Sequence, residues 1–241
     1  NIITGNNITS NNVYGIYSDI SSNNNISENN IADNDDGIYL EGSSTYNNSI
    51  SGNKIANSHF GIYLDYSCNN STFSENTITN STMGVYLWLS NNNVVSGNTI
   101  NSSDIGVFLE ASRNNNVFGN KITNNGGNGI YLPASSYNSI VGNNITNNDW
   151  YGIYLFYSSN NSVSRNNITN NHYGVLIHYS FGSKFYHNNF INNTDQVYSS
   201  GSVNVWDDGY PSGGNYWSDY TGVDVKSGPD QDQPSSDGIG E

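Results

Sequence analysis

Aromatic and acidic side chains recur at a fixed spacing along the chain, two and four residues after a series of glycines. Because side chains of a strand alternate between its two faces, such positions lie on one face. Sugar rings stack on aromatic planes and carboxylates accept hydroxyl hydrogen bonds, so the pattern predicts a glycan-binding face. The residues with this expected role are Tyr39, Glu41, Tyr63, Asp65, Tyr86, Trp88, Phe108, Glu110, Tyr154 and Phe156. The alternative is structural, because stacked tyrosines also favour strands and cover a sheet.

Paired carboxylates are a second feature that could do chemistry. Asp35 and Asp36 are adjacent, and Glu41 and Asp65 could approach them from neighbouring positions. Inverting glycoside hydrolysis uses two carboxyl groups about 6.5–9.5 Å apart, one acting as acid and the other as base. Enzymatic activity is therefore kept as an alternative to a non-enzymatic role.

Metal ligands are present but scattered along the sequence. Asp230, Asp232 and Asp237 resemble an oxygen-ligand calcium loop without the spacing or terminal glutamate of an EF-hand, and the alternative is a solvated acidic tail. Copper prefers thioether, thiolate and imidazole ligands. The residues of these types form no cluster in the sequence: His59, Cys68, Met83, His172, His178 and His187. We expect no cofactor, keep calcium as an open hypothesis and do not expect copper.

The glycines that set this spacing mark an internal repeat of 22 to 24 residues. They are Gly15, Gly37, Gly61, Gly84, Gly106, Gly129, Gly152 and Gly174. Apolar residues alternate with polar or aromatic ones over three or four positions around each glycine, which is strand periodicity, and no ten-residue stretch has a helical stripe. Short strands at this period predict an all-β parallel β-helix of about nine coils. A leucine-rich horseshoe would need a helical segment in each repeat.

One asparagine recurs in every coil, two residues before an isoleucine or phenylalanine. Asparagine tolerates the left-handed conformation of a tight turn, and stacked copies can pass amide hydrogen bonds from coil to coil. The expected ladder is Asn6, Asn29, Asn53, Asn76, Asn98, Asn120, Asn143, Asn166 and Asn188. A serine column is expected to act likewise: Ser21, Ser43, Ser67, Ser90, Ser112, Ser135, Ser158 and Ser180.

Composition excludes several functional classes. The chain of 241 residues has six Lys and Arg residues and a net charge of −14, so it lacks the cations that nucleic-acid binding requires. No apolar run reaches the roughly 20 residues of a membrane span. Cys68 is the single cysteine and excludes an intrachain disulfide. No signal peptide is visible and Asn1 lies inside a repeat, so we expect a mature or excised fragment.

Asn-x-Ser/Thr sequons are frequent in this asparagine-rich chain. Candidate N-glycosylation sites are Asn7, Asn25, Asn47, Asn69, Asn70, Asn80, Asn101, Asn144, Asn160, Asn167 and Asn192. They permit surface glycosylation without demonstrating it. Together with the acidic, Asn/Ser/Thr/Tyr-rich composition, they indicate an extracellular or cell-surface protein.

The repeat ends before the C-terminus, which predicts two parts. Residues 1–194 are expected to form the β-helix, and residues 195–241, with nine acids and one lysine, an acidic Gly-, Trp- and Tyr-rich cap or tail. A cap would cover the last coil, whose open strand edges otherwise template aggregation. The first coil has no obvious cap, so end-to-end stacking of copies into fibres or a sheath is a further hypothesis.

The repeat Asn-Asn-x-Ile-x-Gly-Asn-x-Ile-Thr-Asn followed by Gly-Ile-Tyr-Leu resembles the right-handed β-helix repeats of the NosD-like family over residues 1–194. Residues 205–225 and the final Ser-Asp-Gly-Ile-Gly-Glu resemble the segment that follows such repeats in archaeal surface proteins. The resemblance implies a right-handed, single-stranded parallel β-helix that is secreted or displayed on an archaeal or bacterial surface. That family is named for an accessory protein of copper-enzyme maturation.

The same family shares its repeat with carbohydrate-active β-helices. Their Gly-His-Gly, Arg-x-Lys and Asp-Pro-His signatures are absent from this sequence. We therefore expect a non-enzymatic structural or adhesive module whose partners are glycans or copies of itself. The alternative is a polysaccharide lyase, hydrolase or epimerase.

Overall fold

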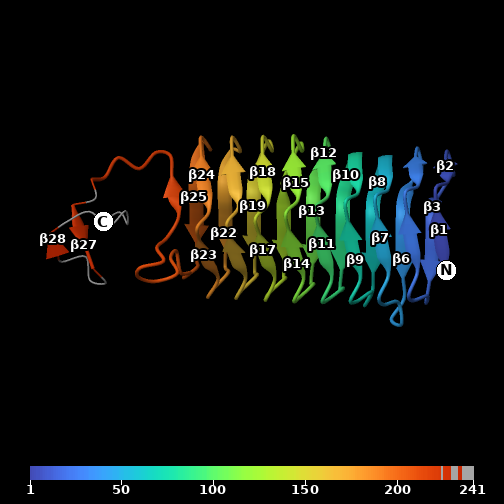
Figure 1. The fold of residues 1–241 in the computed structure, drawn as a ribbon, viewed down its shortest axis with the longest axis horizontal. Helices are drawn as coiled ribbons and strands as arrows, with labels where there is room; N and C mark the ends of the chain where they lie inside the picture. The colour runs from blue at the N-terminus through green and yellow to red at the C-terminus, as the bar shows by residue number, and fades with distance from the viewer. Residues whose placement is uncertain (224, 229–232, 235–241) are drawn as a thin grey trace.

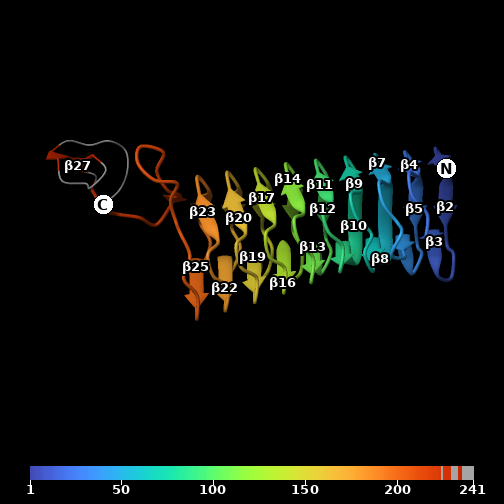
Figure 2. The ribbon, with the colours of Figure 1, turned by 90° about the horizontal axis from the view of Figure 1, so that it is seen from below.

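Each sequence repeat forms one circuit of a right-handed parallel β-helix in the computed structural model, which describes residues 1–223, 225–228 and 233–234. Figures 1 and 2 show the coils side by side along a straight rod, with the N-terminus at one end. The fold expected from the repeat is thus confirmed. The described residues include no helix long and apolar enough to cross a membrane.

Three stacks of parallel strands run along the rod and are called the first, second and third sheet. The first sheet contains β1 (Ile2–Thr4), β4 (Asn25–Ser27), β7 (Ser49–Ser51), β9 (Thr72–Ser74), β11 (Val94–Ser96), β14 (Asn116–Phe118), β17 (Ser139–Val141), β20 (Ser162–Ser164) and β23 (Lys184–Tyr186). The second contains β2 (Asn7–Thr9), β5 (Asn30–Ala32), β12 (Thr99–Asn101), β15 (Lys121–Thr123), β18 (Asn144–Thr146), β21 (Asn167–Thr169), β24 (Asn189–Ile191) and β26 (Tyr216–Trp217). The third contains β3 (Tyr14–Asp19), β6 (Asp36–Glu41), β13 (Ile105–Glu110), β16 (Ile130–Pro133), β19 (Tyr151–Phe156), β22 (Tyr173–His178) and β25 (Asp195–Ser200).

Two long strands and a hairpin complete the architecture. Strands β8 (Lys54–Asp65) and β10 (Thr77–Trp88) run without interruption through both the second and the third sheet. Beyond the coils, β27 (Lys226–Ser227) pairs antiparallel with β28 (Gln233–Pro234).

The parallel register brings identical residue types together inside the rod. Ile31 pairs with Ile55, and Ile78 pairs with both Ile55 and Ile100, so one apolar column is formed by residues 22 to 24 positions apart. All four are at most 1% exposed. Full burial of such a side chain contributes about 1.5–3 kcal/mol, so the stacked columns are the main source of stability.

The repeated glycines are required by close packing between coils. A Cβ built on Gly106 would lie 2.6 Å from the carbonyl oxygen of Gly129 and 2.5 Å from Cγ2 of Ile122. At each of the eight positions the next coil's carbonyl oxygen lies 2.5–2.6 Å from the built Cβ. No side chain fits there without moving the backbone, which explains why the repeat retains glycine.

The expected asparagine ladder lies at the corner between the first and second sheets. Each asparagine donates its backbone N–H and its Nδ2 to Oδ1 of the next, as Asn98 does to Asn120 at 2.9 Å and 2.9 Å. The left-handed conformation belongs to the preceding residue, for example Glu28 with φ 57° or Gly52 with φ 64°. The expectation that the ladder asparagine takes this conformation is wrong: its neighbour makes the turn, and the asparagine side chain points inward.

Two more amide ladders stabilise the other corners. One runs through Asn24, Asn48, Ser71, Asn93, Asn115, Asn138, Asn161, Ser183 and Asn204. The other joins Ser103, Asn125, Asn148, Asn171 and Asn193. Stacked donors and acceptors thus satisfy the buried backbone N–H groups at each bend of the chain.

The serine column differs from the expected one in two coils. Ser90 N–H donates to Oγ of Ser112 at 3.0 Å, and the same link recurs as far as Ser202. In the earlier coils Thr45 and Cys68 are the fully buried members, whereas Ser43 is exposed. Ser67 occupies the turn with φ 64° and is only half-buried. The prediction that Ser43 and Ser67 belong to the stacked serine column is therefore wrong.

Parallel pairing continues past residue 194, where the sequence analysis places the end of the β-helix. Strand β25 pairs with β22 from Asp195 onward, because its alternation of residues matches the third sheet. Trp206 then stacks on Phe185 and Trp217 on Phe190, each with ring centroids 4.5 Å apart. These indoles cover the apolar columns of the last coil.

Candidate functional site

The outer face of the third sheet differs in chemistry from the other two. Outward positions of the first and second sheets carry mainly Asn, Ser and Thr, whereas those of the third carry aromatic and acidic side chains. We call this surface the aromatic face; its rings are Tyr14, Tyr17, Tyr39, Phe60, Tyr63, Tyr86, Trp88, Phe108, Tyr131, Tyr151, Tyr154, Phe156, Tyr173 and Tyr198, and its acids are Asp19, Asp36, Glu41, Asp65, Glu110 and Asp195. All the glycan-binding candidates from the sequence lie on it.

The central tyrosines of this face stack on one another. Tyr63 and Tyr86 have ring centroids 4.7 Å apart and planes inclined by 4°, and Tyr131 and Tyr154 stack with a similar geometry. The ring faces are therefore covered by the coils above and below. Tyr39 and Phe108 are only 8% exposed. The central rings present their edges, rather than their faces, to solvent.

The carboxylates of the aromatic face accept hydrogen bonds from these tyrosines one coil earlier. Tyr39 donates its hydroxyl to Asp65 Oδ2 at 2.6 Å, and Tyr86 donates to Glu110 Oε2 at 2.5 Å. Burial, followed by the bonded carboxylate, raises the pKa of both phenols. Tyr17 makes the same bond to Glu41 at 2.9 Å, and this bond is the main cause of a pKa raised to about 12. Glu41 and Glu110 keep acceptor sites for a ligand, because an ionised carboxylate has about four. The second oxygen of Asp65, Oδ1, is instead buried without a hydrogen-bond partner.

Trp88 and Phe156 occupy positions that carry acids in other coils. Trp88 pairs with Glu110 in register, and its ring contacts Tyr66 with centroids 6.5 Å apart. Phe156 meets Tyr157 edge-on, with centroids 4.6 Å apart. Both side chains are half-buried and do not belong to the central stack. Their ring faces are not covered by parallel stacking, unlike those of the central tyrosines.

An acidic cluster interrupts the aromatic face near its N-terminal end. Ligand atoms of Asp35, Asp36 and His59 all lie within 4.8 Å of one another. Asp36 is 7% exposed, and its Oδ1 has no hydrogen-bond partner. Burial, with a smaller contribution from the negative charge of Asp35, raises the pKa of Asp36 to about 6.

The sequence analysis named Asp35 and Asp36 as a carboxylate pair and His59 as a scattered potential copper ligand, but it did not place the three together. Glu41 and Asp65, expected beside Asp36, accept tyrosine hydroxyls instead. His59 follows Asp35 by 24 residues, as Gly61 follows Gly37. The repeat spacing could therefore have placed His59 beside Asp35.

Basic side chains lie away from the aromatic face. Lys54 and Lys121 are exposed on the second sheet, Lys184 on the first, and Arg113 and Arg165 outside all strands. Among the side chains that the structure describes, none on the aromatic face is a lysine or arginine. Its field is therefore negative.

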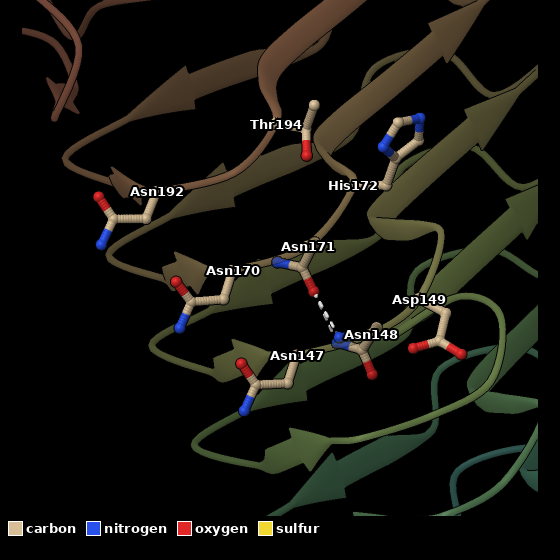
Figure 3. Close-up of a pocket in the computed structure, with 8 residues that line it drawn as sticks. All are labelled: Asn147, Asn148, Asp149, Asn170, Asn171, His172, Asn192 and Thr194. Carbon is tan, nitrogen blue, oxygen red and sulfur yellow. Dashed lines mark hydrogen bonds between the residues drawn. The ribbon is translucent and has the colours of Figure 1, made fainter.

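A shallow polar depression of about 410 Å³ lies at the corner between the second and third sheets (Figure 3). It is lined by Asn147, Asn148, Asp149, Asn170, Asn171, His172, Asn192 and Thr194. Asn148 donates to Asn171 at 2.9 Å as part of a ladder. The asparagines follow from the repeat, so the depression is a structural groove between coils.

The soft ligands named for copper do not come together. The Cys68 thiol is fully buried and donates to the carbonyl oxygens of Asp65 and Leu40 at 3.1 and 3.3 Å, and burial raises its pKa to about 12. A thiolate ligand is therefore not available. Within the described part of the chain, Asp35, Asp36 and His59 form the one group of three metal-ligating side chains. These residues do not fit a thiolate or thioether copper site.

Two further predictions concern other parts of the surface. The calcium candidates Asp230, Asp232 and Asp237 lie outside the described residues. None of the eleven sequon asparagines is buried. Glycosylation at those positions stays a prediction.

Fold and surface together define a parallel β-helix solenoid with one aromatic, anionic face. The family model described as periplasmic copper-binding protein (NosD) matches residues 1–73 and 47–222, and the chain belongs to this family. Among curated proteins, none matches the sequence.

Solved structures with the same fold include carbohydrate-active proteins. The A-module of mannuronan C-5 epimerase AlgE6 from Azotobacter vinelandii has a TM-score of 0.69 and 16% identity, over 84% of this chain and 60% of that one. The periplasmic alginate epimerase AlgG gives 0.64 and 21%, over 76% and 49%. Bacteriophage CBA120 tailspike protein 2 gives 0.65 and 15%, over 82% and 35%. The chain spans 60% or less of the length of these proteins, and at these identities the likeness is one of fold.

Proposed function

We propose that this protein is an extracellular or periplasmic glycan-binding module that binds a neutral polysaccharide along the aromatic face. The observation that carries the proposal is the asymmetry of the rod: one of its three sheets gathers rings and carboxylates outward, while the other two present mainly short polar side chains. Stability alone would not need this difference, because all three sheets have the same buried columns.

In this proposal the acids and the rings have different roles. Glu41 and Glu110 are half-buried, each held by one tyrosine hydroxyl, and offer their remaining acceptor sites to sugar hydroxyls. Trp88 and Phe156 offer ring faces for stacking. The central tyrosines support the acids and line the surface with ring edges, so they are not stacking platforms.

The negative charge of the aromatic face favours a neutral ligand over an acidic one. The aromatic face carries carboxylates, and none of its described side chains is a lysine or arginine that could pair with an acidic polysaccharide. Like charges brought together on a protein surface disfavour binding. A neutral chain avoids this repulsion and uses the same carboxylates as acceptors.

A carbohydrate-active enzyme is the second candidate. The buried Asp36 beside Asp35 offers a carboxyl group with a raised pKa, as a general acid requires. The folds of alginate epimerases are similar to this chain. Turnover would have to be detected to favour this alternative.

The test is a glycan array of neutral and acidic oligosaccharides, followed by calorimetry with the best ligand. Glu110→Gln and Trp88→Ala should each weaken binding at least about tenfold, because each removes a contact that the other cannot replace. Glu75→Gln makes the same charge change at an exposed corner away from the aromatic face and should have no effect. Equal binding by all variants, or binding of acidic glycans alone, would refute the proposal. Shortened, unsaturated or epimerised products would establish the enzyme instead.

A further inference from the structure

We propose that Asp35, Asp36 and His59 form a binding site for a divalent metal ion. The three side chains come from two neighbouring coils: Asp36 begins β6, Asp35 precedes it, and His59 lies in β8. The backbone holds the coils together here, since His59 N–H donates to the Asp35 carbonyl oxygen at 2.6 Å. The site is thus built into the parallel register.

The position of Asp36 is the observation that points to a cation. In register, Asp36 lies between Tyr14 of the preceding coil and Phe60 of the next, in an otherwise aromatic part of the column. The Phe60 backbone N–H donates to its carboxyl group and the nearby His59 also favours its charged form, whereas Oδ1 has no hydrogen-bond partner. Buried charges in proteins are paired or coordinate metals. No lysine or arginine pairs with this one among the described residues.

The spacing of the three ligands fits a shared ion after a small adjustment. Their ligand atoms lie within 4.8 Å of one another. Metal–ligand distances of about 2.0–2.2 Å place two ligands of one zinc ion no more than roughly 4.4 Å apart. Asp35 and His59 are both exposed and can make this small adjustment, whereas Asp36 is buried. The buried acid therefore fixes the site and the two exposed side chains close on it.

The donor set selects the class of ion. Two carboxylate oxygens and one imidazole nitrogen suit divalent first-row transition metals, whereas calcium and magnesium prefer all-oxygen sites. The imidazole ring lies against Phe60, with centroids 4.0 Å apart, which limits its orientations. Three protein ligands leave at least one coordination position for water or for a ligand on the aromatic face. The same nitrogen and oxygen donors would hold Cu²⁺ more tightly than Zn²⁺.

This proposal does not depend on glycan binding. The three residues coordinate the ion by themselves, and the glycan variants Glu110→Gln and Trp88→Ala lie outside the cluster. Failure of either proposal therefore leaves the other testable.

The experiment is calorimetric titration of the chelator-treated protein with Zn²⁺ at pH 7, with Cu²⁺, Mn²⁺ and Ca²⁺ as further probes. We expect one zinc site per chain and much weaker binding of Ca²⁺. Asp35→Asn, Asp36→Asn and His59→Ala should each lower the affinity for Zn²⁺ at least about tenfold. His172→Ala is the matched control, because His172 has the same place in the repeat as His59 but lies outside the cluster.

Folding of the variants is checked by circular dichroism. Asp35 and His59 are exposed, so their variants test the site without changing a buried side chain. Zinc should also raise the Tm of the wild type, because an ion that binds only the folded state stabilises it. Absence of zinc binding, or binding that is equal in wild type, Asp35→Asn and His59→Ala, would overturn the proposal. A loss of binding in His172→Ala alone would assign the ion to another site.

Discussion

The amide ladder between the first and second sheets should be a major contributor to stability, and Asn120→Ala tests this. Asn120 is 1% exposed and donates to the carbonyl oxygens of Val95 and Phe118 at 2.8 and 3.1 Å and to Asn143 Oδ1 at 2.9 Å. Its Oδ1 accepts both donors of Asn98. Truncation removes all five bonds at once.

The magnitude follows from the groups left without a partner. The backbone N–H of Asn98 loses the acceptor that Asn120 provides, and the Val95 carbonyl loses its side-chain donor. A buried polar group left unsatisfied costs about 1–3 kcal/mol. Two such groups, with the lost packing, give an expected destabilisation of roughly 3–5 kcal/mol. This is a large part of the total of about 5–15 kcal/mol typical of folded domains.

The assay is equilibrium unfolding in urea, followed by circular dichroism and by tryptophan fluorescence. Asn120→Ser should lose less than alanine, because Ser71 and Ser183 already serve as acceptors in the neighbouring ladder. Asn189→Ala, on the exposed surface of β24, is the control and should cost less than about 0.5 kcal/mol. If Asn120→Ala were as stable as this control, the ladder would not be a source of stability and the argument from orphaned groups would fail.

Three further predictions follow from single positions. Gly106→Ala should destabilise the fold by at least about 2 kcal/mol in the same urea assay, because its Cβ would lie 2.6 Å from the Gly129 carbonyl oxygen. Gly126→Ala is the control and should be close to neutral, because the atom nearest to its Cβ would lie 3.8 Å away. Folding raises the pKa of Asp36 from 3.8 to about 6, so the free energy of unfolding, measured with a chelator present, should fall as pH rises from 4 to 6. Asp36→Asn should therefore be more stable than wild type at pH 7, by at most roughly 3 kcal/mol, and equally stable at pH 4. A variant that is less stable than wild type at pH 7 would contradict this. Cys68 should not react with a thiol reagent until urea unfolds the chain, since its thiol is fully buried with a pKa of about 12; rapid labelling of the folded protein would show that the coil opens locally.

The sequence could predict most of the β-helix because its information is periodic. A step of 22 to 24 residues between glycines fixes which residues become neighbours, and the parallel register then follows. The second and third amide ladders were missed because serine replaces asparagine at positions such as Ser71 and Ser103, which hides the column. Thr45 and Cys68 were missed for a similar reason: a hydroxyl or thiol of comparable size takes the serine's place.

By itself, the sequence determined the coil, its apolar columns, its main ladder and the face on which tyrosines and acids gather, since each depends only on spacing along the chain. The tertiary structure decided which parts of those side chains are stacked, hydrogen-bonded or buried, and which remain exposed. Stacking covers the ring faces of Tyr63 and Tyr86, hydroxyl bonds engage Asp65 and Glu110, and burial leaves Asp36 without a full set of partners beside His59. Side-chain orientation and desolvation depend on contacts between coils, so they arise only when the chain is stacked upon itself.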